Sequence, residues 1–218
     1  MSQNQDYGTY REIAAKAMHG TTTVGILCSD GVVLGADSRA SMDTFLASPE
    51  AVKINMIDEN LGMTIAGSVG DAQYLVKILK AQNELYKMNE GRSMSPNAAT
   101  SFLSVLLQEN KMMPFMVGLI VGGMSVDGPA LYSLDAIGGL IKESKFISVG
   151  SGQSGALGYL EDVYKEGKTV QEMARHAAKA IKIAMKRDIA TGDTIHIAMI
   201  TKAGYKEVTA EQLESSSK

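Results

Sequence analysis

The sequence predicts an α+β fold in which antiparallel sheets carry their helices in groups on the outside. Strand-like and helix-like segments come in blocks, in the order strands, two helices, strands, two helices and strands. This order lacks the strict strand–helix alternation of parallel α/β folds. Tight turn signals join neighbouring strand-like segments, which is typical of antiparallel hairpins. No linker interrupts the chain, so we expect one domain after an N-terminal leader.

Two strand pairs form the first block. Ser29, Asp30 and Gly31 make a tight turn signal inside the first pair, which predicts a β-hairpin. Residues 41–52 contain Pro49 and are expected to be a loop. The four expected strands are Thr22–Cys28, Val32–Ala36, Lys53–Ile57 and Gly62–Ala66.

Four segments predict helices. Asp71–Asn89 carries apolar residues at helical spacing, and Ser95-Pro96 opens a second helix with a serine cap and proline in the first turn. Gly155–Lys165 is the third, and the capping box from Thr169 to Glu172 opens the fourth. The remaining strands are expected at Phe115–Val121, Ala130–Asp135, Lys145–Val149, Thr194–Thr201 and Tyr205–Val208, followed by a frayed polar end at 210–218.

The composition excludes several classes of function. Of the 218 residues, 45% are hydrophobic and 21% charged, as in ordinary globular proteins. A net charge of −3 without a basic block argues against nucleic-acid binding, and no apolar run is long enough to span a membrane. His19, His176 and His196 lack the spacing of a metal site, so no metal or other cofactor is expected. Cys28, the single cysteine, cannot form an internal disulfide, which indicates a reducing compartment such as the cytoplasm.

The junction between Gly20 and Thr21 predicts the chemistry. Residues 1–20 show no sustained apolar pattern, whereas three threonines and a strand follow Gly20. A threonine hydroxyl is a weak nucleophile that needs a base. If the leader is removed, the freed α-amine of Thr21, with a reference pKa of about 7.7–8.0, supplies that base. Gly20, without a Cβ, can adopt the turn that brings its carbonyl onto the Thr21 hydroxyl. The alternative is that the threonines simply begin a β-strand.

Two charged residues end up near Thr21 if the strands lie side by side. Asp37 ends the second strand and Lys53 begins the third. A positive Lys53 would favour the ionised hydroxyl and keep the neighbouring amine neutral, while Asp37 would orient it. Gly67 offers a backbone N–H to a developing oxyanion, worth about 10²–10³ in rate. Taken singly, each of these is an ordinary surface charge or turn glycine.

As an ordered set, these residues resemble proteasome β-type subunits, most closely the archaeal ones. The resemblance runs from Gly20 to about Thr201, and its motifs as a set are highly specific. They are Gly20–Gly25, Gly35–Arg39, Lys53, Met63–Gln73, Gly122-Gly123, Asp135, Gly150–Gly152, Lys186–Asp188 and Gly192.

The resemblance implies the N-terminal nucleophile hydrolase fold, a four-layer αββα sandwich of two antiparallel sheets flanked by helix pairs. It implies that residues 1–20 are a propeptide removed by self-cleavage and that 21–218 form the catalytic domain. The implied activity is that of a threonine endopeptidase that degrades unfolded proteins to peptides inside a closed barrel. The implied partners are a homo-heptameric β ring stacked in pairs, α-type subunits and an ATP-dependent unfoldase, in the cytoplasm.

The same resemblance implies roles for individual residues. Thr21 is the nucleophile and its amine the base, supported by Asp37 and Lys53, with Gly67 at the oxyanion. Ser151 and Asp188 polarise the amine, together with Thr191, where similar proteins carry serine. The substrate-binding positions are Ala40, Ala51, Ile65 and Val69, which line the first specificity pocket, and Ser41, whose backbone pairs with substrate. The apolar pocket implies cleavage after hydrophobic residues, with the polar Asn55 at its base.

Three alternatives remain open. Gly150–Gly155 fits a dinucleotide-binding loop, although two helices follow it where that motif needs a strand–helix–strand unit. A non-catalytic ring subunit on the same scaffold should lack Thr21 or Lys53, whereas both are present. The third alternative is another hydrolase of the same superfamily that acts on small amides.

Overall fold

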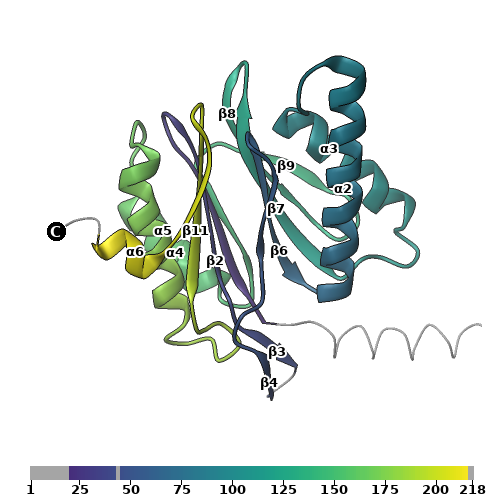
Figure 1. Ribbon diagram of the computed structural model, residues 1–218. Helices are drawn as coiled ribbons and strands as arrows, with labels where there is room; N and C mark the ends of the chain where they lie inside the picture. Colours follow the sequence, from purple (N-terminus) through teal and green to yellow (C-terminus); the bar gives the residue numbers. More distant parts are fainter. Residues whose placement is uncertain (1–19, 43–44, 216–218) are drawn as a thin grey trace, which may run out of the picture.

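The computed structural model describes residues 20–42 and 45–215 and confirms the predicted sandwich. Figure 1 shows two sheets side by side in the middle of the molecule, with helices outside both. The first sheet has the order β10-β1-β2-β11-β12 and the second the order β5-β6-β7-β8-β9. Every neighbouring pair of strands in the two sheets is antiparallel.

The strands of the first sheet are β1 (Thr22–Leu27), β2 (Gly31–Asp37), β10 (Phe146–Gly150), β11 (Ile195–Thr201) and β12 (Gly204–Thr209). Those of the second are β5 (Ile54–Asp58), β6 (Leu61–Gly67), β7 (Val117–Ser125), β8 (Gly128–Leu134) and β9 (Leu140–Glu143). The helices are α2 (Val69–Glu90), α3 (Pro96–Glu109), α4 (Gln153–Val163), α5 (Val170–Ala184) and α6 (Ala210–Ser215). A separate hairpin consists of β3 (Ala40–Met42) and β4 (Phe45–Ser48).

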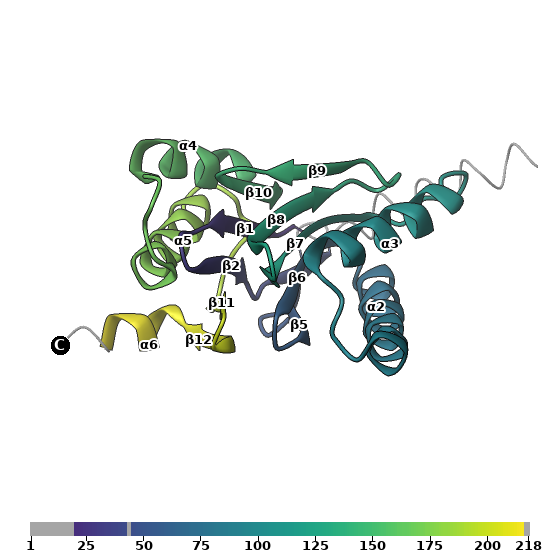
Figure 2. The same ribbon diagram turned by 90° about the horizontal axis from the view of Figure 1, so that it is seen from above.

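Three layers of apolar side chains hold the sandwich together. One packs α4 and α5 on the first sheet, one packs α2 and α3 on the second, and a third lies between the sheets. Figure 2 shows the two helix groups on opposite sides when the molecule is seen from above. β2 is buried along its whole length because it is the central strand of its sheet and is covered on both faces.

The helix caps match the sequence-based prediction. Ser95 caps α3 with its side chain, and Pro96 occupies the first turn. Thr169 and Glu172 form the reciprocal capping box of α5. The Thr169 side chain thus satisfies the Glu172 N–H, and the Glu172 side chain satisfies the Thr169 N–H, at the start of the helix where backbone N–H groups lack helical partners.

Three local predictions were wrong. Residues 41–52 are not all loop, because β3 and β4 pair there, and the short strand β9 was missed. The end of the chain is not frayed from residue 210, because α6 packs the buried Leu213 against the core. Thr209 and Gln212 exchange capping hydrogen bonds at its start, a signal that the sequence did contain.

The topology also excludes the dinucleotide-loop alternative. β10 is an edge strand antiparallel to β1, and α4 and α5 follow it before the chain returns as β11. The structure therefore has no strand–helix–strand unit with parallel strands after Gly150 among its described residues. Within the same residues, no helix is both long and apolar enough to cross a membrane.

Gly25 tests how closely the two sheets pack. A Cβ built on Gly25 in β1 would lie 2.7 Å from Ile120 and 2.8 Å from Leu131 of the facing sheet. We expect Gly25→Ala to lower the free energy of unfolding by about 1–3 kcal/mol, as overpacked cores do. The matched control is Gly70→Ala in α2, where a Cβ meets nothing within 4 Å and helix propensity improves. Chemical denaturation measures both, and equal effects would contradict the close packing.

Candidate functional site

The first strand brings Thr21 to the centre of a polar cluster at one end of the sandwich. Thr22 pairs with Gly150, and Ile195 pairs with Asp37. The start of β1, the ends of β2 and β10, and the start of β11 therefore lie at the same end of the first sheet. Thr21 is 1% exposed, and its hydroxyl donates to the Gly20 carbonyl oxygen at 2.7 Å. The predicted contact between this hydroxyl and the preceding carbonyl is therefore present.

Gly20 lies in a space that admits no side chain. A Cβ built on it would lie 1.8 Å from the Cβ of Ala190. Its N–H donates to the Ser41 hydroxyl at 3.3 Å, so the last residue before Thr21 is held from both sides. Gly150 also packs closely against Thr21. Its φ is +116°, and a Cβ built on it would lie 2.0 Å from the Thr21 carbonyl oxygen.

Asp37 and Lys53 form a buried ion pair next to this junction. The Lys53 ammonium donates to Asp37 Oδ1 at 2.9 Å, and the two side chains are 7% and 0% exposed. The same ammonium lies 3.4 Å from the Gly20 carbonyl oxygen. Burial lowers the pKa of Lys53, although the charge of Asp37 and their hydrogen bond oppose the shift. Asp37 and Lys53 thus lie next to Thr21, as expected.

Four hydrogen bonds fix the Asp37 carboxylate. Oδ1 accepts from the Thr22 N–H at 2.9 Å as well as from Lys53. Oδ2 accepts from the N–H groups of Arg39, at 3.1 Å, and Gly192, at 3.0 Å. Such a carboxylate can orient Lys53 without rotating away, because every donor around it comes from a different segment of the chain.

A second cluster lies on the other side of Thr21. The Thr21 N–H donates to Ser151 Oγ at 3.1 Å, and the Ser151 hydroxyl donates to Asp188 Oδ2 at 2.5 Å. The Thr191 hydroxyl donates to the same oxygen at 2.5 Å and also lies 2.7 Å from the Thr22 hydroxyl. Thr191 therefore makes the hydroxyl contact with Asp188 that a serine could make, despite its additional methyl group.

Arg39 is a residue whose place in the site the sequence analysis missed. Its guanidinium donates twice to Asp193, at 3.0 and 3.2 Å, and once to the Ile189 carbonyl at 2.8 Å. A Cβ on Gly192 would meet this guanidinium at 2.2 Å. Arg39 thus holds the loop that carries Asp188 and Thr191 against the end of β2. Its position two residues after Asp37 in the sequence was the available signal.

The remaining predicted residues are less closely connected. Gly67 ends β6 with a φ of +124°, where a Cβ would lie 2.0 Å from the Met116 carbonyl oxygen. Ala40 and Ile65 are buried, Ala51 is partly buried and Val69 is 43% exposed. The Ile65 N–H donates to the Lys53 carbonyl at 3.0 Å, which places β6 directly beside Lys53.

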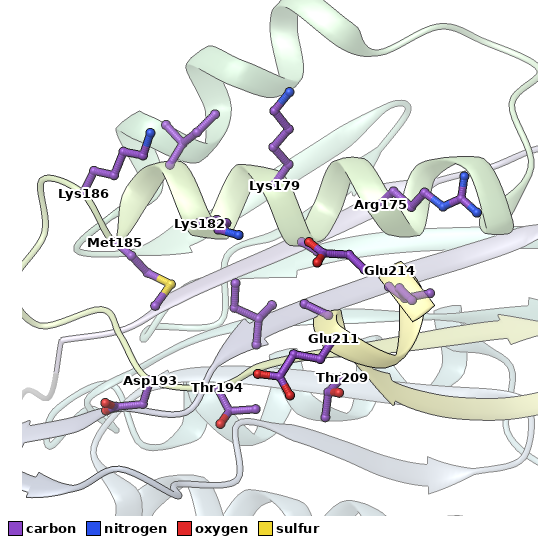
Figure 3. A pocket seen from close by; sticks show the side chains of 15 residues that line it. Arg175, Lys179, Lys182, Met185, Lys186, Asp193, Thr194, Thr209, Glu211 and Glu214 are labelled. Carbon is purple, nitrogen blue, oxygen red and sulfur yellow. The ribbon is translucent and has the colours of Figure 1, made fainter. Parts of the chain in front are cut away.

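Two cavities show which of these side chains share a space. One of about 330 Å³ is lined by residues that include Asp37, Ala51 and Lys53, but not by Ala40, Ile65 or Val69. The other, of about 710 Å³, lies between α5 and α6. Figure 3 shows it with lysines on α5 and two glutamates on α6. None of the predicted site residues lines this larger cavity, so size alone does not mark the site.

The charged groups of the cluster are not arranged for a metal ion. Across residues 20–42 and 45–215, no three His, Cys, Asp or Glu side chains gather as metal ligands would. The cluster instead combines an ion pair, a carboxylate and several hydroxyls around one backbone junction. This is a set suited to proton transfer and to attack by a hydroxyl.

The chain is similar to known proteins over most of its length. A family model described as "Proteasome subunit" matches residues 17–200. The proteasome subunit beta of Methanosarcina thermophila is 46% identical over 200 residues, 92% of this chain and 95% of that protein. The proteasome subunit beta of Methanohalophilus mahii is 48% identical over 199 residues, with coverage of 91% and 95%. That of Methanocaldococcus vulcanius is 46% identical over 197 residues, with coverage of 90% and 88%.

We expect the buried carboxylate of Asp37 to contribute far more to the stability of the fold than the exposed carboxylate of Asp193. Asp37→Asn leaves the Lys53 ammonium buried without its counter-charge, so we expect the free energy of unfolding to fall by about 3 kcal/mol or more. Asp193→Asn is the matched control, because its partly exposed pair with Arg39 (Arg39 30% and Asp193 25% exposed) leaves no buried charge when broken, and such pairs typically contribute about 1 kcal/mol. Urea denaturation compares the two, and equal losses would contradict the buried-pair interpretation.

Proposed function

The chain belongs to the family of proteasome subunits, and from that membership we propose that it is a threonine endopeptidase that frees its own nucleophile. It is a β-type subunit of the 20S core particle. One observation carries the proposal of catalysis. The Gly20 carbonyl oxygen lies 2.7 Å from the Thr21 hydroxyl and 3.4 Å from the Lys53 ammonium.

The first reaction is removal of residues 1–20. The Thr21 hydroxyl attacks the Gly20 carbonyl carbon, and the Lys53 ammonium, close to the carbonyl oxygen, stabilises the negative charge that develops there. The C–N bond then breaks as the hydroxyl proton is transferred to the Thr21 nitrogen, which leaves Gly20 joined to Thr21 as an ester and frees that nitrogen as an amine. Water hydrolyses this ester and releases the propeptide.

The second reaction is peptide hydrolysis by the mature chain, residues 21–218. The Thr21 amine, already beside Ser151, takes the hydroxyl proton as that oxygen attacks a substrate carbonyl. The amine then gives the proton to the leaving nitrogen, and an acyl ester forms. A water molecule that the same amine activates hydrolyses the ester. Lys53, held in place by Asp37, supplies a positive charge next to Thr21. The Gly67 N–H donates a hydrogen bond to the negatively charged oxygen that develops on the substrate carbonyl.

The substrates of this activity are unfolded polypeptides. Ala40, Ala51, Ile65 and Val69 form the apolar specificity pocket in this proposal, and Ser41 pairs with the substrate backbone. Cleavage after hydrophobic residues follows. The assembly is a pair of homo-heptameric β rings closed by α-type subunits and supplied by an ATP-dependent unfoldase in the cytoplasm.

A non-catalytic ring subunit is the competing assignment. A scaffold role gives no reason for a buried lysine held within 3.4 Å of the Gly20 carbonyl oxygen, where its burial alone is unfavourable. This contact favours the catalytic assignment.

Thr21→Ala should abolish both reactions. In a homogeneous assembly of this variant, no hydroxyl is left to attack Gly20, so the propeptide stays attached and peptide hydrolysis is absent. Intact-mass measurement and hydrolysis of a fluorogenic peptide with a hydrophobic residue before the cleaved bond report the two reactions. Thr21→Ser keeps a hydroxyl and should retain both, and normal propeptide loss in Thr21→Ala would refute self-cleavage.

Lys53→Met should lose the activity even in particles that remain folded, although Asp37 without its counter-charge also lowers the free energy of unfolding. Methionine retains the apolar length of the side chain but not its charge, so we expect kcat to fall at least about 100-fold. Lys168→Met is the matched control, because that lysine pairs with Glu172 at the surface at 2.6 Å. Thermal unfolding verifies that both variants are folded. Turnover at the wild-type rate in Lys53→Met would rule out its proposed role.

A further inference from the structure

Thr22 contacts both halves of the polar cluster, although the catalytic proposal uses only its neighbour Thr21. Its N–H donates to Asp37 Oδ1 at 2.9 Å, on the side of the ion pair. Its hydroxyl lies 2.7 Å from the Thr191 hydroxyl, on the side of Asp188. Thr22 is 0% exposed, so neither contact is shared with solvent.

The direction of these hydrogen bonds follows from counting protons. Thr191 has one hydroxyl proton, and a carboxylate only accepts, so Thr191 donates to Asp188 at 2.5 Å. Thr191 must then accept from Thr22. The Thr22 hydroxyl proton therefore begins a chain that continues through Thr191 to Asp188 Oδ2.

The same carboxylate oxygen connects this chain to the Thr21 nitrogen. Asp188 Oδ2 accepts from Ser151 at 2.5 Å, and Ser151 Oγ accepts from the Thr21 N–H at 3.1 Å. Because Thr191 and Ser151 both donate to this one oxygen, the contact that holds Thr191 also fixes the position that Asp188 offers to Ser151. The Thr22 hydroxyl thus acts on the group that becomes the amine without touching it.

The neighbouring loop leaves room for the Thr22 hydroxyl and for little else. A Cβ built on Gly152 would lie 2.1 Å from Thr22 Oγ1 and 3.2 Å from Asp188 Oδ2. Any larger residue at Gly152 would push the hydroxyl off Thr191. The glycine after Ser151 is therefore matched to the Thr22 contact.

We propose that Thr22 is a positioning residue, whose hydroxyl holds Thr191 and Asp188 in the orientation that places Ser151 on the Thr21 nitrogen. This role rests on the proposed function, because it matters only if the Thr21 amine is the base. Thr22 acts on the proton acceptor and not on substrate binding. Its loss should therefore lower kcat and leave KM unchanged.

Thr22→Val, in assembled particles that have lost their propeptide, tests the proposal. Valine keeps the shape but not the hydroxyl, and we expect kcat to fall about threefold to tenfold, the effect of one hydrogen bond. Thr22→Ser restores the hydroxyl and should recover the wild-type kcat. Thr23→Val is the matched control with an unchanged kcat, because that buried hydroxyl donates instead to the Val149 carbonyl at 3.1 Å.

A double-mutant cycle separates positioning from a general loss of packing. If Thr22 acts through Thr191, adding Thr22→Val to Thr191→Val should cause no further loss of kcat. Additive losses would overturn the proposal. If Thr22→Val does not assemble, Gly152→Ala displaces the same hydroxyl and should lower kcat with KM unchanged, and a wild-type kcat there would also overturn it.

The controls distinguish failure of this proposal from failure of the proposed function on which it rests. Wild-type particles without peptidase activity would refute the proposed function itself. Active wild-type particles, inactive Thr21→Ala particles and a wild-type kcat in Thr22→Val would leave the function standing and refute the role of Thr22.

Discussion

The site depends on one buried carboxylate, that of Asp37. Its two oxygens accept from Thr22 in β1, from Lys53 just before β5, from Arg39 just after β2 and from Gly192 in the loop after α5. A carboxylate without these donors would be too costly to bury at this depth. Through Lys53 and three backbone N–H groups, Asp37 fixes the positions of both sheets and the loop around Thr21.

The proposed function asks one residue to serve in two reactions, and the contacts of Thr21 suit both. While Gly20 is attached, the nitrogen of Thr21 is an amide that can only donate, and it donates to Ser151. In the proposed mechanism, cleavage of the bond turns this nitrogen into a base that already lies beside Ser151, Asp188 and the ion pair. Little rearrangement is then needed, because Ser151, Asp188, Thr191 and the ion pair are already hydrogen-bonded to one another or to neighbouring backbone. Preorganisation of this kind is what makes electrostatic stabilisation effective.

Much of the fold could be predicted from local signals. The capping residues Ser95 and Thr169 marked their helices correctly, because caps satisfy backbone groups within a few residues of themselves. The hairpin β3–β4 and the strand β9 were missed although their partners lie close in the sequence, because strands this short carry too few residues to show a clear alternation of apolar and polar side chains. The helix α6 was missed because a single buried residue, Leu213, anchors it.

The sequence by itself determined which residues can do chemistry here: a hydroxyl after a glycine, a lysine, an aspartate, and a family pattern that joins them. Only the tertiary structure decided that Thr22 contacts both Asp37 and Thr191, that Arg39 holds the loop of Asp188, and that Ala190 leaves space for glycine alone at position 20. The reason is physical. Residue type fixes what a group can donate, accept or attack, but a 2.7 Å contact between residues 22 and 191 exists only once β1 and the loop before β11 have been packed together.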